Sequence, residues 1–202
     1  MREAERRRAT VVGGVTIQDP PIARALFSDV RWSWIWLLVR FYVGYEWLAA
    51  GLEKAQSPVW VGSQAGTAIT GFVKGALAKT GGDHPDVQGW YAWFLQNAVL
   101  PYAAAWSWLI TIGEITVGIA LLIGLFTGIA AFVGLFMNVN YLLAGTVSSN
   151  PFLFILAALL VLAWKTAGWV GFDRWVLPAL GTPWSPGPLK PEESRKRREA
   201  RR

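Results

Sequence analysis

Long apolar runs separated by short polar segments dominate the chain after residue 32. Four of these runs are about 20 residues long. Twenty helical residues rise about 30 Å, which is the thickness of the hydrocarbon core of a bilayer. The pattern therefore predicts four membrane-spanning helices, with approximate ranges 33–52, 107–126, 128–147 and 152–171.

The connection between the first two predicted spans, residues 53–106, has a mixed composition. Two pieces of it follow helical spacing, and a turn with the sequence TGGDHPD separates them. Neither piece reaches the roughly 18 apolar residues that a span needs. We therefore predict an all-α fold: an integral membrane four-helix bundle, residues 33–177, with an extracytoplasmic amphipathic helical cap at 53–106 between helices 1 and 2.

The two ends of the chain are polar and basic. Residues 1–32 form a predicted N-terminal arm with a short interfacial helix and no cleavable signal peptide, and residues 178–202 form a basic tail expected to be disordered. Residues 1–31 contain six Lys and Arg, the chain from Lys165 onward contains nine, and the long connection contains three. The positive-inside rule then places both termini in the cytoplasm and the cap outside it.

The composition supports a multi-pass protein of the cell membrane. It also excludes several kinds of metal and redox site. Hydrophobic residues make up 53% of the chain and charged residues 16%, and the 13 Trp are typical of interfacial belts. There is no cysteine and His84 is the single histidine. Disulfides, thiolate metal sites and multi-histidine sites are therefore excluded, so we expect no metal and no covalently bound cofactor. The expected surroundings are lipid and other protein subunits, and no basic–aromatic pattern predicts nucleic-acid binding.

The first predicted span carries ionisable side chains on two helical stripes. The basic stripe also contains small residues that allow another helix to approach closely, and the acidic stripe lies about a third of a turn away. The basic stripe is Arg40, Gly44, Trp47, Gly51 and Lys54, and the acidic stripe is Tyr42, Glu46, Ala49 and Glu53. A charge at mid-membrane costs at least about 2.5 kcal/mol, so both stripes cannot face lipid cheaply.

Depth along the predicted spans brings several polar residues to the outer half of the bundle. Lys54 is expected above them at the mouth, whereas Arg40 lies about 10 Å from the cytoplasmic end and is too deep to pair directly with Glu114. The expected cluster is Glu46, Glu114, Asn138, Asn140 and Tyr141.

Two interpretations of this cluster remain open. Buried polar groups can simply pair to fix helix register. Alternatively they line a pocket under the cap, in which two neighbouring carboxylates, Glu46 and Glu114, hold and transfer protons during quinone chemistry or bind a polar head group. His84, between two aspartates in the turn, is expected to be a surface histidine, with a proton relay as the alternative.

Three stretches of the sequence resemble the DoxX family, over about residues 35–178. They are LLVRFYVGYEWLAAGLEK, then GEITVGIALLIGLFTGIAAFVGLFMNVNYLLAG, then NPFLFILAALLVLAWKTAGWVGFDRWVLP. The DoxD-like branch, related to the membrane subunit of thiosulfate:quinone oxidoreductase, is the most similar. Arg40, Lys54 and Glu114 match recurring family positions.

The resemblance implies a subunit of a quinone-linked oxidoreductase, with thiosulfate as a candidate reductant. Quinone is then a non-covalent substrate, Glu46 and Glu114 handle protons, and the substrate-binding candidates are Arg40, Lys54, Asn138, Asn140 and Tyr141. The alternative is a non-catalytic accessory or scaffold subunit of a larger membrane complex. A small-molecule transporter is a third hypothesis, which the lack of matched repeats disfavours.

Overall fold

The computed structural model describes residues 10–12, 15–17 and 19–181. The parts of the predicted arm and tail at residues 1–9 and 182–202 lie outside the described residues. The first described element is a short antiparallel hairpin of β1 (Thr10–Val12) and β2 (Val15–Ile17), which the all-α prediction did not include. The remaining described elements are helices, so the predominantly helical prediction is confirmed.

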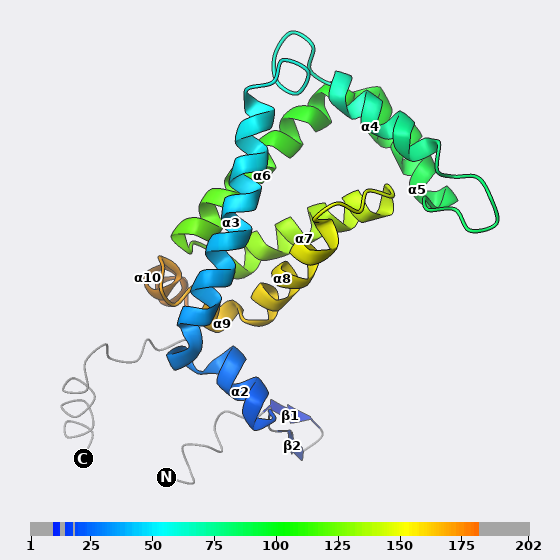
Figure 1. Cartoon of the computed structure of the whole chain (residues 1–202). Helices are drawn as coiled ribbons and strands as arrows, with labels where there is room; N and C mark the ends of the chain where they lie inside the picture. The colour runs from blue at the N-terminus through cyan, green and yellow to red at the C-terminus, as the bar shows by residue number, and fades with distance from the viewer. Residues whose placement is uncertain (1–9, 13–14, 18, 182–202) are drawn as a thin grey trace, which may run out of the picture.

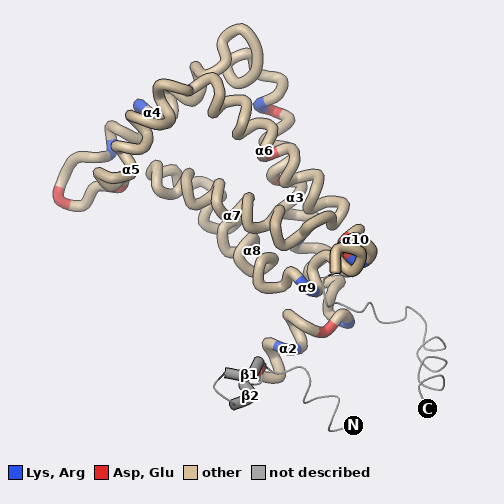
Figure 2. Tube along the Cα trace, turned by 180° about the vertical axis from the view of Figure 1, so that it is seen from behind, with Lys and Arg blue, Asp and Glu red and all other residues tan. Residues whose placement is uncertain are grey.

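Four long helices form the main body, and shorter helices surround them (Figure 1). The long helices are α3 (Ser33–Ala55), α6 (Ala103–Ile123), α7 (Thr127–Leu143) and α8 (Asn150–Leu162). The shorter ones are α2 (Pro21–Ser28), α4 (Thr67–Leu77), α5 (Gly89–Phe94), α9 (Trp164–Ala167) and α10 (Asp173–Ala179). Charged residues are sparse along the long helices and gather at their ends and in the loops (Figure 2).

The closest helix pairing joins α3 to α6, and glycines make it possible. A Cβ on Gly118 would lie 2.5 Å from the backbone nitrogen of Leu48, and a Cβ on Gly51 would lie 2.7 Å from Ile115. The backbones therefore approach closely, as small residues permit between membrane helices. Gly44 and Gly51 of the basic stripe lie in this contact, and Arg40 and Trp47 of the same stripe are also buried. Lys54 is partly buried, whereas Tyr42, Ala49 and Glu53 of the acidic stripe are exposed.

The connection between α3 and α6 differs in part from the predicted cap. Its first helical piece forms α4, as expected. The second piece does not end before the next span, because α5 continues through a π-helical turn at Leu95–Val99 and a 3-10 turn at Leu100–Tyr102 into α6. The result is a bent helix, Gly89–Ile123, whose first part lies beside α4 (Figure 1). This first part, α4 and the loop between them are called the arm below.

Two hydrogen bonds tie this arm to the end of α7. The Lys79 ammonium donates to the carbonyl of Gly145 at 2.6 Å, and the Tyr91 hydroxyl lies 2.9 Å from the carbonyl oxygen of Asn140. An apolar cluster that includes Val73, Leu95 and Ala144 fills the space between them.

The fourth predicted span, 152–171, is not one continuous helix. The helix α8 ends at Leu162 after 13 residues, about 20 Å, and the chain turns at Ala163 before the single turn of α9. The carbonyls of Ala167, the last residue of α9, and of Val170, which follows it, accept no helical hydrogen bond, and the Arg40 guanidinium donates to both. The end of α9 therefore supplies acceptors for a buried cation.

Length and composition single out one helix of the described part as able to cross a membrane. This helix is Gly89–Ile123, with a mean hydropathy of 1.8 in its most apolar window. The helices α7 and α8 are apolar but shorter.

Candidate functional site

A buried carboxylate links the three helices α3, α6 and α7. Glu114 of α6 is 1% exposed. Its Oε1 accepts a hydrogen bond of 2.8 Å from the Tyr141 hydroxyl, and its Oε2 lies 2.7 Å from the Lys54 ammonium. The charge of Glu114 is therefore compensated inside the chain, as buried charges generally require. Lys54, Glu114 and Tyr141 are called the carboxylate cluster below.

Lys54 reaches Glu114 from the last turn of α3, and the following loop holds it there. Its ammonium lies 5.1 Å from the ring centroid of Trp60, a cation–π distance. The carbonyl of Trp60 in turn accepts a 2.7 Å hydrogen bond from Ser107 on α6. The lysine is thus fixed between its carboxylate and an aromatic ring, with 19% of its side chain exposed.

Polar groups without a partner lie close to the carboxylate cluster. Asn138 of α7 is 0% exposed, and within the described part neither its amide nitrogen nor its amide oxygen has a hydrogen-bond partner. The indole nitrogen of Trp47 is also buried without a partner there. A Cβ on Gly134, one turn before Asn138, would lie 2.9 Å from this nitrogen. Such groups cost about 1–3 kcal/mol each when unpaired, so a polar ligand atom or water that reached them would be bound favourably.

Asn138 and the carboxylate cluster share neighbouring helical turns. Asn138 and Tyr141 are three residues apart on α7, and Trp47 and Lys54 are seven apart on α3, so each pair lies on one face. Val117, one turn from Glu114 on α6, also faces Gly134. The site therefore extends over about two turns of three helices.

Two residues predicted for this cluster lie elsewhere. Asn140 faces the arm, where it accepts from Tyr91, and its side-chain nitrogen donates to the carbonyl of Phe136 at 2.8 Å. Glu46 is half-exposed on another flank of α3, and no hydrogen bond or ion pair within residues 19–181 joins it to Glu114 or to another residue. The structure thus brings together Lys54, Glu114 and Tyr141, but not Glu46 and Glu114.

Arg40 forms a second polar centre at the opposite end of the bundle. It is 1% exposed, and its guanidinium donates to Ala167 at 3.1 Å and to Val170 at 2.7 Å. The expectation that Arg40 does not pair with Glu114 agrees with this geometry. Gly124 lies directly against the guanidinium, where a Cβ would overlap it.

Asp173, which was not among the predicted site residues, completes this second centre. Its two carboxylate oxygens accept the backbone N–H groups of Phe126 and Thr127, at 2.5 and 2.8 Å, where α7 begins. Burial raises the pKa of Asp173, while these hydrogen bonds and the nearby charge of Arg40 act in the opposite direction. The sequence signal was the Trp-x-Gly-x-Asp-Arg pattern that ends at Arg174.

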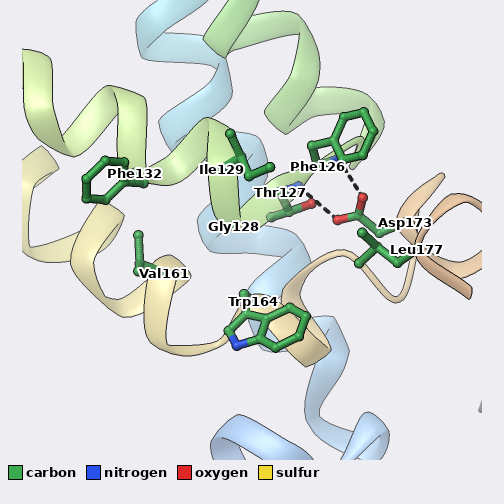
Figure 3. Close-up of a pocket in the computed structure, with 9 residues that line it drawn as sticks. All are labelled: Phe126, Thr127, Gly128, Ile129, Phe132, Val161, Trp164, Asp173 and Leu177. Atoms are coloured by element: carbon green, nitrogen blue, oxygen red, sulfur yellow. Dashed lines mark hydrogen bonds between the residues drawn. The ribbon is translucent and has the colours of Figure 1, made fainter. Parts of the chain in front are cut away.

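A cavity of ≈ 380 Å³ lies beside this centre, between the start of α7, the end of α8 and α10 (Figure 3). Its walls are almost entirely apolar and include Phe132, Val161, Trp164 and Leu177. It is remote from the carboxylate cluster, because Thr127 and Tyr141 are 14 residues apart on α7, about 21 Å.

Within the described residues, no group of three or more His, Asp or Glu side chains is placed to hold a metal ion. His84 lies exposed in the loop before α5. The polar centres of this structure are thus built from carboxylates, amides, a phenol and basic side chains.

Comparison with known proteins assigns the chain to a protein family. No curated protein and no solved structure matches the chain significantly. The model of the DoxX family matches residues 35–146. This range holds α6, α7, all but the first two residues of α3 and the whole carboxylate cluster, and it covers more than half of the 202 residues. The chain therefore belongs to the DoxX family, whose members are generally membrane proteins.

Proposed function

We propose that the chain is a four-span membrane subunit of a quinone-linked oxidoreductase, of the DoxD-like kind. In this proposal α3, α6, α7 and the segment containing α8 cross the bilayer. Both termini are cytoplasmic, in line with the excess of Lys and Arg in the terminal segments, and the α4–α5 arm lies on the outer side as the cap.

The observation that carries the proposal is the carboxylate cluster. Reduction of a quinone to a quinol takes up two electrons and two protons, so its site needs a group that can hold and release protons. Glu114 can do this in an environment with little water, because Tyr141 hydrogen-bonds its carboxyl group and Lys54 balances its charge when it is ionised.

The unpartnered groups beside the cluster support binding of the quinone head. A quinone carbonyl is an acceptor, and both the Asn138 amide nitrogen and the Trp47 indole nitrogen are donors that lack a partner in the described part. A ligand carbonyl placed between α3 and α7 would recover the cost of leaving them unpaired. The electrons would come from a small anionic reductant such as thiosulfate, attracted to the exposed Lys74 on the outer arm.

Quinone reduction by membranes containing the protein tests this role. Thiosulfate-dependent reduction of a water-soluble quinone analogue should be lost in Glu114→Gln, which keeps the shape and the Tyr141 contact but cannot release a proton. Glu53→Gln is the matched control, because Glu53 is exposed near the same end of α3. Full activity in Glu114→Gln would remove Glu114 from proton transfer.

A specific observation also favours a second function, that of an accessory subunit. Glu46 carries a carboxylate midway along α3, half-exposed and without a partner in the described part of the chain. A charge at that depth in lipid is costly, so another subunit would be expected to cover it. The native mass of the complex extracted in mild detergent, together with the Glu114→Gln assay, decides between the two. Partner chains with redox cofactors and quinone reduction that survives Glu114→Gln would indicate the accessory role, and a lone monomer or homo-oligomer would leave the chemistry to this chain.

A further inference from the structure

The cavity beside α10 presents carbon atoms to any ligand. The backbone N–H groups at its edge are already engaged, because those of Phe126 and Thr127 donate to Asp173, whereas the buried Thr127 hydroxyl has no hydrogen-bond partner in the described part (Figure 3). Its volume, ≈ 380 Å³, lies near the lower end of the roughly 300–1,000 Å³ range of ligand pockets. It is therefore suited to a single apolar chain.

The cavity is continuous with the outer apolar surface of α7. Ile129 and Phe132 line it, yet they are 65% and 57% exposed. In a membrane protein this surface faces lipid, so a hydrocarbon chain can enter from the side without crossing a polar barrier.

The basic side chain of Lys165 lies beside the wall of the cavity. The Trp164 ring forms part of the wall, and the ammonium of the adjacent Lys165 lies 5.8 Å from the centroid of that ring. Lys165 is exposed and forms no ion pair with any residue in the range 19–181. Tryptophan beside lysine is typical of the zone where acyl chains meet head groups.

We propose that this cavity binds one acyl chain of an anionic phospholipid, with the lipid phosphate bound by Lys165. The occupant has an apolar part that matches the cavity and a negative charge that matches the cation. A quinone fits less well, because it carries no charge to match Lys165, although the buried Thr127 hydroxyl at the cavity could donate to one of its carbonyls. This site is independent of the carboxylate cluster and of the oxidoreductase proposal.

Native mass spectrometry of the full chain in detergent can count the bound lipid. The probes are dioleoyl phosphatidylglycerol, dioleoyl phosphatidylcholine with the same chains, and decylubiquinone as a neutral competitor. Wild-type protein should prefer phosphatidylglycerol. One lysine near an anionic head group contributes about 1 kcal/mol, so Lys165→Gln should lower that preference about fivefold. Lys74→Gln, an exposed lysine on the arm, should leave it unchanged.

A larger side chain in the cavity should weaken binding of the acyl chain and leave the preference for one head group over the other unchanged. Val161→Phe should reduce binding of both lipids equally, and Ile129→Trp, at an exposed wall position, gives the same test if Val161→Phe does not fold. Equal binding of the two lipids by wild type, or an unchanged preference in Lys165→Gln, would overturn the proposal. Displacement of phosphatidylglycerol by equimolar decylubiquinone would instead identify a quinone site.

Discussion

Removing Lys54 from the Lys54–Glu114 pair should lower the free energy of unfolding far more than removing the charge of Glu114. Glu114 has 2% of its side chain exposed and Lys54 has 19%. Lys54→Met leaves a buried carboxylate unpaired, and breaking a buried pair in this way costs about 3–5 kcal/mol. Glu114→Gln keeps a hydrogen-bonding group opposite Tyr141, and the freed lysine can extend to the interface, so its cost should be about 1–2 kcal/mol.

The double variant separates this explanation from general damage to packing. With both charges gone, no unpaired charge remains, so Lys54→Met with Glu114→Gln should be about as stable as Glu114→Gln alone. The coupling energy of the cycle is then about 3 kcal/mol or more. Unfolding of the purified protein by titration with a denaturing detergent in mixed micelles, followed by helical circular dichroism, measures all four free energies. If the two single costs simply add in the double variant, the pair does not stabilise the fold as described.

Three further variants test other contacts by the same unfolding measurement. Gly118→Val should lower the free energy of unfolding by at least about 2 kcal/mol, because its Cβ would lie 2.5 Å from the Leu48 nitrogen; Gly75→Ala, with open space around it, should be neutral or stabilising. Asp173→Ala removes both acceptors at the start of α7 and should cost about 1–2 kcal/mol or more; no loss would contradict its capping role. Asn138→Leu should raise stability by about 1–3 kcal/mol while abolishing quinone reduction, and retained activity would exclude Asn138 from the site.

The helical pattern of the first long helix could be predicted well from the sequence. Spacing alone placed Arg40, Gly44 and Gly51 on one stripe, and the structure buries that stripe against α6. The reason is that a single helix has a fixed angle per residue, so which side chains share a face follows from their numbering. Depth along two antiparallel helices placed Lys54 above Glu114 at the mouth of the predicted cluster, but it did not predict the 2.7 Å ion pair between them.

Relations that depend on the rotation of one helix against another could not be predicted. Depth placed Glu46 and Glu114 at a similar level, and spacing placed Glu46 on a separate stripe of α3, but neither could say which of the two stripes faces α6. The break at Ala163 was missed because residues 152–164 are apolar without interruption and contain no glycine or proline that would mark a turn. The role of Asp173 also depends on a contact across 47 positions, with Phe126.

The guanidinium contacts of Arg40 determine when α3 can reach its final position during synthesis. The acceptors at Ala167 and Val170 are synthesised 127 and 130 residues after the arginine that needs them. At about 5–20 residues per second, roughly 6 to 26 seconds separate the two events on the ribosome. In the proposed topology α3 enters the membrane first, and during that interval it holds a charge whose final acceptors do not yet exist. It must remain near water or the membrane-insertion machinery until the end of the chain arrives, so a product truncated before residue 167 would keep its first helix from settling at its final depth.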